Sequence, residues 1–298
     1  MKNRILFIIN PISGTHHADD IEKIAREVID EEQFDVEFRQ TEHKRHGIEL
    51  AKQAVQEGFD IVAAVGGDGT INQVASQLVG TDTAMAVVPH GSGNGLAYHL
   101  HIPIHLKKSI QIINALHFES VDVCQLNDSC FFSIAGIGFD AKVAYDFNRD
   151  VHRGFFNYFK HILKNYFEYP SGEYTIEYDG KLLRDKAFFI TFANSSQWGY
   201  NVKIAPMASV QDGRLDICIV KKPKVLFKML AMDLPKLLSS HFDQSDIVQY
   251  LRCEKVRILP ADSTKMYLHI DGDSAGLTDC VEIKVLPRAL KMIVPAQI

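Results

Sequence analysis

The segment that combines glycines with polar residues most densely lies at 66–72, where the chain reads Gly66-Gly67-Asp68-Gly69-Thr70-Ile71-Asn72. It follows an apolar run at 60–65 that is typical of a buried parallel strand, and Thr70 is predicted to cap the helix that follows. Glycines at such a turn let a phosphate approach backbone N–H groups and the helix dipole. A carboxylate beside a phosphate requires a cation between them, so Asp68 predicts a magnesium position. The motif alone also fits an ordinary turn with a surface carboxylate.

Further polar residues follow the ends of other predicted strands, at 4–9, 34–39 and 84–89. Those strands alternate with predicted helices at 19–29 and 47–57, which indicates a parallel sheet whose ligands gather at the carboxyl ends of its strands. A second glycine turn after the strand at 84–89 runs into a further helix. We therefore expect one phosphate or ribose site that combines the first turn with Asn10, Pro11, Ser13, Gly14, Thr41, Gly91, Ser92, Gly93 and Asn94.

The second half of the chain changes to short strands separated by turns. Hairpin signals stand at 127–129, between strands at 121–126 and 130–135, and at 179–180, between strands at 174–178 and 186–193. Further strands are predicted at 215–220, 255–259, 266–270 and 281–285, and a closing strand at 292–294 is expected to return to the first domain. The fold class is α/β plus β. It consists of an N-terminal Rossmann-like three-layer domain at 1–120, joined by 287–298, and a mostly antiparallel β-sandwich at 121–286.

Composition narrows the functional class. A formal charge of −5 over 298 residues argues against a nucleic-acid partner, because no strongly basic arm offsets it. Five cysteines without a C-x-x-C pair favour a reducing compartment and core positions. No apolar run reaches the length of about eighteen residues that a membrane span needs. We expect a cytoplasmic protein.

Two predicted helices are ambiguous. Aromatic residues alternate with cations at 150–169, which suits either a membrane interface, an acyl-chain groove or a helix packed in the core. An amphipathic segment at 225–242 allows the same alternatives.

Taken together, the order and spacing of these motifs resemble the diacylglycerol kinase catalytic-domain family, which is related to sphingosine and ceramide kinases. The loop at 66–70 is similar to the nucleotide loop of that family, although NAD kinases carry a similar one. Gly91-Ser92-Gly93-Asn94 resembles the second nucleotide motif in its sphingosine and ceramide kinase form. The resemblance implies the fold shared by NAD kinases and diacylglycerol kinases. It also implies ATP and Mg²⁺ as cofactors, and a membrane lipid such as diacylglycerol or a sphingoid base as acceptor.

The resemblance also implies roles for acidic residues in the second half. Asp212 looks like the side-chain ligand of a structural magnesium ion, although a simple turn before a strand explains it nearly as well. Asp140 is expected near the acceptor lipid. Asp273 stands where the family has the Glu proposed as general base, one methylene shorter, and Asp271 is the reserve candidate. The lipid hydroxyl would enter a cleft between the domains and attack the γ-phosphoryl group in line.

Alternatives remain at this stage. A soluble NAD kinase-like enzyme would share the first glycine loop, and a lipid- or nucleotide-binding regulator without catalysis would account for the Asp273 departure. We further expect peripheral contact with a membrane, and a homodimer is compatible with the sequence.

Overall fold

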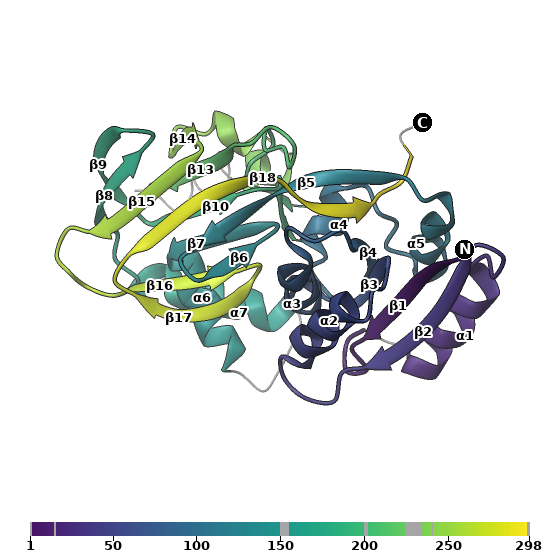
Figure 1. Ribbon diagram of the computed structural model, residues 1–298. Coiled ribbons are helices and arrows are strands. Elements are labelled where there is room, and N and C mark those ends of the chain that lie inside the picture. The colour runs from purple at the N-terminus through teal and green to yellow at the C-terminus, as the bar shows by residue number, and fades with distance from the viewer. Residues whose placement is uncertain are drawn as a thin grey trace. The chain divides into compact units, whose positions relative to one another are not determined.

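The structure is a computed structural model that describes residues 2–14, 16–149, 155–199, 202–223, 234–239 and 241–296. The chain divides into two compact units (Figure 1). Unit 1 comprises Met1–Val123 together with Pro287–Ile298, and unit 2 comprises Cys124–Leu286. No helix in the described part of the chain is long and apolar enough to cross a membrane.

Unit 1 is built on a parallel sheet. Its strands follow the order β2-β1-β3-β4, with β1 at Asn3–Ile9, β2 at Phe34–Gln40, β3 at Ile61–Gly66 and β4 at Ala84–Pro89. The end of β18 (Val281–Ile293) adds a further parallel strand, in which Met292 pairs with Met85 of β4. Every residue of β3 and β4 is buried, because helices cover both faces of the sheet.

The helices of unit 1 form the two outer layers, as Figure 1 shows for α1 on one side of β1 and β2 and for α2 and α3 on the other. Helix α1 (Ala18–Val28) shares an apolar core with α5 (Leu106–Gln111), which continues into the 3-10 turn Ile112–Ala115. On the opposite face α2 (His46–Gln56) packs against α3 (Asp68–Leu78). The short α4 (Gly95–His99) follows the second glycine turn. The predicted three-layer α/β domain is confirmed.

The register of unit 1 places the strand ends together. Ile9 lies opposite both Gln40 and Val65, and Gly66 lies opposite Pro89. The four loops that follow these strands therefore leave the same edge of the sheet, as expected for a parallel array.

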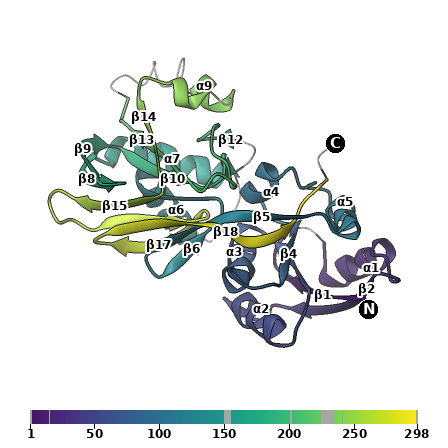
Figure 2. The same ribbon diagram turned by 45° about the horizontal axis from the view of Figure 1, so that its top comes forward.

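Unit 2 contains two antiparallel sheets that enclose an apolar core (Figure 2). The first follows the order β14-β13-β10-β7-β16-β17, and the second contains the start of β18 followed by β15, β8 and β9, with the hairpin of β5 and β6 attached. The strand bounds are β5 Phe118–Leu126, β6 Ser129–Phe131, β7 Ile134–Gly138, β8 Gly172–Tyr178, β9 Lys181–Ala187, β10 Phe189–Ala193, β13 Leu215–Val220, β14 Val248–Cys253, β15 Lys255–Pro260, β16 Met266–Ile270 and β17 Asp273–Thr278. The predicted β-sandwich is confirmed.

Helix α6 (Phe139–Asn148) packs on the six-stranded sheet, and α7 (Phe155–Glu168) packs against α6. A separate two-stranded ribbon pairs β11 (Gln197–Gly199) with β12 (Val202–Lys203). A second apolar cluster contains Phe139 and Val143 of α6 together with Phe188 and Phe189, where β10 begins, and Tyr166 of α7 packs against it. In that cluster the rings of Phe139 and Phe188 stack with centroids 4.4 Å apart.

Two predicted strands are each two strands in the structure. The strand expected at 130–135 ends as β6 at Phe131 and resumes as β7 at Ile134 in the other sheet. The strand expected at 186–193 likewise ends as β9 at Ala187 and resumes as β10 at Phe189. Both apolar runs are continuous because a chain that crosses between the sheets of a sandwich stays in the core, so hydrophobicity alone does not mark the crossing.

The helix predicted at 225–242 is not one continuous element. Residues 224–233 and 240 lie outside the described part of the chain. The described remainder forms α9 (Leu234–Leu238) and the 3-10 turn Phe242–Gln244.

Candidate functional site

The two glycine turns of unit 1 pack backbone against backbone. A Cβ atom added to Gly91 would lie 2.4 Å from the Cα atom of Gly67, which no real side chain tolerates. Only glycine therefore permits this approach. The arrangement brings the predicted residues at 66–70 and 91–94 into one local structure.

Asp68 holds the second turn in place. Its Oδ2 atom accepts a hydrogen bond from the backbone N–H of Asn94 at 2.8 Å, and its Oδ1 atom accepts one from Gly95 at 2.9 Å. These N–H groups begin α4, so the carboxylate satisfies donors at a helix N-terminus. A Cβ atom on Gly93 would lie 2.5 Å from Oδ2, which explains a glycine there as well. Asp68 thus has a positioning role that sequence reasoning did not predict.

The side chain of Asn94 stabilises the second glycine turn through hydrogen bonds to its backbone. Its backbone is left-handed at φ 53°, a conformation that asparagine tolerates better than most residues. The side-chain Oδ1 accepts the N–H of Gly91 at 3.1 Å, and Nδ2 donates to the Gly91 carbonyl at 2.8 Å. Asn94 is buried, whereas Ser92 is exposed at the tip. The exposed Ser92 is therefore better placed than Asn94 to meet a ligand.

The first loop of unit 1 connects to the same region through Asn10. Asn10 Nδ2 donates to Thr70 Oγ1 at 2.9 Å, and the backbone N–H and hydroxyl of Ser13 both bond the Asn10 carbonyl. The prediction that Thr70 caps α3 is wrong. The helix begins at Asp68 with Gly67 in the cap position, because the first turn starts immediately after β3 and leaves the Thr70 hydroxyl to accept from Asn10.

The remaining predicted nucleotide residues occupy the same edge of the sheet. The backbone N–H of Thr41 bonds the Ile9 carbonyl at 2.9 Å, and Thr41 follows β2 directly. Pro11 is exposed in the turn after β1, and Asn72 is partly exposed in α3. Asn10, Ser13, Thr41 and both glycine turns are therefore neighbours by topology, as the sequence analysis expected.

His90 is part of this region and was missed. It is buried after β4, and its Nε2 accepts the backbone N–H of His16 at 3.3 Å. The ring occupies the space that a Cβ atom on Gly14 would need, because that atom would lie 2.3 Å from Nε2. Burial of the ring lowers the pKa of His90, with a further contribution from His16. The sequence did contain a signal for His90, because it lies directly between the strand at 84–89 and the glycine turn that begins at Gly91.

The acidic side chain in unit 1 is compatible with a magnesium-bound phosphate. Each Asp68 oxygen accepts one backbone hydrogen bond, and an ionised carboxylate offers about four acceptor positions in all. A carboxylate of this kind would accept a hydrogen bond from a water ligand of Mg²⁺. The glycines of the two turns leave backbone room for phosphate oxygens. These residues fit a metal–nucleotide ligand.

In unit 2 the two acidic residues of the β16–β17 turn differ in their surroundings. Asp271 is buried, and its carboxylate accepts the backbone N–H groups of Phe132 at 3.2 Å, Ser133 at 2.9 Å and Ile134 at 3.1 Å. It therefore anchors the crossing from β6 to β7. Asp273 is exposed at the first position of β17. Of the two, Asp273 is the one accessible to a substrate.

Asp140 lies inside unit 2. Its Oδ2 atom is 3.2 Å from His269 Nε2, and Ala141 donates its backbone N–H to Oδ1 at 2.8 Å. Both side chains of the pair are 3 % exposed. The carboxylate joins α6 to β16, which gives it a structural role. Proximity of Asp140 to an acceptor lipid stays a prediction.

Asp212 stands in the turn before β13, as predicted, but its carboxylate is engaged by protein groups. Oδ1 accepts the backbone N–H of Arg214 at 3.0 Å, and Oδ2 pairs with the guanidinium of Arg252. The same guanidinium places its Nε 3.1 Å from Oδ1 of the buried Asp216. Neither Arg252 nor Asp216 was singled out from the sequence.

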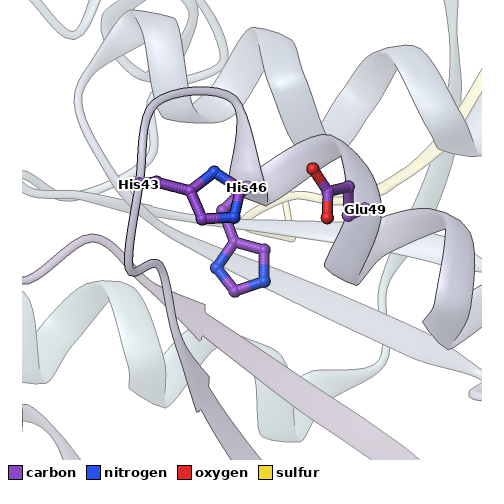
Figure 3. A group of neighbouring side chains, drawn as sticks. All are labelled: His43, His46 and Glu49. Atoms are coloured by element: carbon purple, nitrogen blue, oxygen red, sulfur yellow. The ribbon is translucent and has the colours of Figure 1, made fainter.

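The loop from β2 into α2 gathers His43, His46 and Glu49, whose potential ligand atoms lie within 4.8 Å of one another (Figure 3). The two imidazole rings stack, with centroids 4.4 Å apart and planes 15° apart, so their in-plane lone pairs do not converge on one point. His46 Nδ1 accepts the backbone N–H of Glu42 at 3.0 Å, which leaves the proton of the neutral ring on Nε2. This geometry describes a loop held by His46, and we assign no metal to it.

The aromatic segment at 150–169 is only partly described, since residues 150–154 and the side chains of 155–160 lie outside the described part. In the remainder, Tyr166 packs edge-on against Phe139 with ring centroids 6.2 Å apart, and Phe167 is 68 % exposed. The described residues favour a helix packed on the core.

Comparisons with known proteins give a consistent result along the whole chain. Residues 4–126 match the family described as the diacylglycerol kinase catalytic domain. Residues 133–294 match the family described as the YegS C-terminal NAD kinase beta sandwich-like domain.

Among curated relatives, a diacylglycerol kinase of Bacillus subtilis (strain 168) is 33% identical over 236 residues, which cover 76% of this chain and 75% of that protein. A diacylglycerol kinase of Staphylococcus aureus (strain MRSA252) is 26% identical over 289 residues, covering 93% of this chain and 88% of the relative. A solved structure of a diacylglycerol kinase from Bacillus anthracis str. Sterne has a TM-score of 0.76 at 20% identity, and the match covers 98% of this chain and 97% of the other. This last likeness concerns the fold alone.

Proposed function

Because the chain belongs to the diacylglycerol kinase family, we propose that it is an ATP- and Mg²⁺-dependent lipid kinase that phosphorylates a hydroxyl of diacylglycerol or a related lipid. The Bacillus subtilis and Staphylococcus aureus relatives carry the name diacylglycerol kinase, and this supports the kinase assignment. A sphingoid acceptor is included because Gly91-Ser92-Gly93-Asn94 resembles the form of the motif in sphingosine and ceramide kinases.

The observation that carries the proposal is the pair of glycine turns joined by Asp68. The Gly67–Gly91 contact and the Asp68 hydrogen bonds to Asn94 and Gly95 hold two strand–helix turns at the edge of the sheet where ligands bind. The sequence contains no G-x-x-x-x-G-K-[ST] loop, so backbone N–H groups take a larger part in phosphate binding. In this proposal Asn10, Ser13 and Thr41 line the same nucleotide site.

Catalysis in this proposal rests on positioning and charge. Mg²⁺, when bound with ATP, would neutralise the phosphate oxygens. Asp68 keeps the second turn in place and accepts a hydrogen bond from the solvated ion. Asp273 accepts the proton of the acceptor hydroxyl, directly or through one water, because it is the exposed carboxylate of its turn. Asp271 is assigned a structural part, since three backbone N–H groups occupy its carboxylate.

We expect the protein to reach its acceptor at a membrane surface as a peripheral protein. Lipid acceptors reside in bilayers or micelles, and the described part of the chain contains no membrane-spanning helix. Binding to vesicles that contain diacylglycerol, measured by sedimentation, tests this expectation independently of turnover.

The first experiment measures ADP release with Mg-ATP against mixed micelles of diacylglycerol, monoacylglycerol, sphingosine or ceramide, with NAD as a soluble acceptor. Turnover on one lipid is the expected result. Turnover on NAD alone would replace the lipid kinase with an NAD kinase-like enzyme. ATP binding without turnover on any acceptor would favour a regulator that has lost catalysis.

We predict that Asp68→Ala lowers kcat/KM for ATP at least about tenfold, a loss of about 1.4 kcal/mol in transition-state stabilisation. The substitution removes the acceptors for both Asn94 and Gly95 N–H groups. Asp60→Ala is the matched control, because Asp60 lies at the opposite end of β3 and accepts a single backbone N–H from Arg4. Retention of more than about a tenth of the activity in Asp68→Ala, with the control unchanged, would remove Asp68 from the mechanism.

A further inference from the structure

Arg252 bridges the two carboxylates of the Asp212–Asp216 segment. The segment comprises the turn Asp212-Gly213-Arg214 and the first two residues of β13. Asp216 pairs directly with Arg252 across the β13–β14 ladder, so strand register alone places the guanidinium beside it. Nη2 contacts Asp212 Oδ2, and Nε lies 3.1 Å from Asp216 Oδ1.

Asp216 is the buried carboxylate of the pair, and Arg252 supplies its counter-charge. The Asp216 side chain is fully buried, whereas those of Arg252 and Asp212 are 39 % and 30 % exposed. Burial raises the pKa of the Asp216 carboxyl, against the opposing influence of Tyr250 and Arg252. Among the described residues, no group has the geometry of a hydrogen bond to either Asp216 oxygen. The contact with Arg252 is therefore an ion pair and not a hydrogen bond. A buried carboxylate requires such a partner.

The same segment is the one for which the family resemblance implies a structural magnesium ion on Asp212. A Mg²⁺ ion needs near-octahedral oxygen ligands at about 2.0–2.1 Å. Here the Arg252 guanidinium contacts Asp212 Oδ2, and the Arg214 N–H donates to Oδ1. The positive charge of Arg252 therefore lies beside the oxygen that would bind the metal ion. The residues present do not fit a bound metal without displacement of Arg252.

We propose that Arg252 substitutes for a structural metal ion in this protein, so that unit 2 is stable without a divalent cation at Asp212. One guanidinium charge serves two carboxylates, as a bridging cation would. It also reaches them from a neighbouring strand, which fixes β14 against the turn before β13. The proposal concerns stability and is independent of the proposed kinase function.

The test is thermal unfolding of the nucleotide-free full-length protein in about 1 mM EDTA and in about 10 mM Mg²⁺, conditions that span typical weak Mg²⁺ affinities. The wild-type melting temperature should change by less than about 1 °C between the two. Arg252→Gln should lower the melting temperature in EDTA by about 5 °C or more, because it leaves Asp216 buried without a counter-charge. Mg²⁺ should restore part of that loss, because the freed carboxylates then accept the ion.

Three further variants serve as controls. Arg257→Gln removes an arginine on β15, the next strand along the chain, whose Nε pairs with the exposed Glu282 at 2.9 Å. It should leave both melting temperatures close to wild type. Arg252→Gln combined with Asp212→Asn should lose the recovery by Mg²⁺, because the principal ligand is gone. Arg252→Lys, which keeps the charge, should remain insensitive to the metal.

Direct binding gives a second readout that does not depend on stability. Titration with Mn²⁺, followed by electron paramagnetic resonance, should show one more ion bound to Arg252→Gln than to the wild type. The proposal is overturned if Mg²⁺ stabilises the wild-type protein and Asp212→Asn abolishes that effect. It is equally overturned if folded Arg252→Gln binds no additional Mn²⁺ and shows no recovery in Mg²⁺, or if folded Arg252→Lys binds an additional Mn²⁺ ion.

Discussion

At the scale of single residues, the acidic side chains divide by how many backbone donors they satisfy. Asp68 accepts two backbone N–H groups and Asp271 accepts three, so each fixes a segment of chain as well as carrying a charge. Asp273 lies two residues beyond Asp271 and is exposed. The role of a carboxylate in this protein therefore follows from its surroundings more than from its motif.

The contrast between Asp271 and Asp273 is testable. Asp271→Asn should lower the free energy of unfolding by about 1.5–3 kcal/mol, because it weakens charge-assisted hydrogen bonds to a buried acceptor. Asp273→Asn should change stability by less than about 0.5 kcal/mol and reduce turnover at least about tenfold. Urea unfolding and ADP release measure the two effects. Normal turnover in folded Asp273→Asn would exclude the general-base role.

His90 predicts a pH dependence of stability. Burial and His16 lower its pKa in the folded protein below the ordinary value, so the unfolded chain takes up a proton first as the pH falls. The contribution of His90 to stability is therefore complete above its ordinary pKa of 6.5 and decreases below it. The melting-temperature difference between wild type and His90→Gln should shrink from pH 7.5 to pH 5.5. A difference that is constant over this range would contradict the prediction.

At the scale of elements, the site of unit 1 consists of strand–turn–helix junctions held at one edge of a parallel sheet. Asn10 connects the loop after β1 to α3, and Asp68 connects α3 to α4. Each junction thus supports its neighbour, and a change in one turn is expected to disturb the others.

Gly91→Ala tests this dependence. The new methyl group would meet the Gly67 backbone at 2.4 Å, so the two glycine turns must separate. We expect a loss of about 1–3 kcal/mol in stability from the overpacking, together with weaker ATP binding. Ser92→Ala is the control for stability alone, because Ser92 is exposed and its shortened side chain forces no backbone segments apart. Chemical denaturation and calorimetric titration with ATP distinguish the two variants.

At the scale of the whole molecule, unit 1 is completed by residues from the far end of the chain. Gly80 donates its backbone N–H to Ala289, and Val294 donates to His117. Arg288 donates its backbone N–H to Asp122 Oδ1 at 2.8 Å. Unit 1 is therefore held together in part by hydrogen bonds to residues 288–294.

Deletion of residues 287–298 should prevent unit 1 from folding. It removes the fully buried Leu290, Met292 and Ile293, each worth about 2–5 kcal/mol, which together approach the total stability of a typical domain. Limited proteolysis should then cleave within residues 2–123 while a chain ending at Ala296 resists. A deleted protein that still binds ATP with unchanged affinity would refute this requirement.

The sequence by itself determined the fold class and the positions of most strands. Alternation of apolar runs with amphipathic helices is a local property, and it located β3, β4 and the sheet edge that gathers Asn10, Thr41 and the glycine turns. The exact bounds of β13 and β16 were also predicted, at 215–220 and 266–270. The glycine turns were recognisable because close backbone approach restricts the residue type.

Only the tertiary structure decided the partners of the polar side chains. The capping role of Asp68, the burial of Asp271, the place of His90 against Gly14 and the Arg252 bridge all join residues far apart in the chain. The sequence also did not reveal that the apolar runs at 130–135 and 186–193 cross from one sheet to the other, because the residues on both sides of each crossing are apolar. Such contacts depend on strand register and sheet packing, which short-range periodicity does not encode.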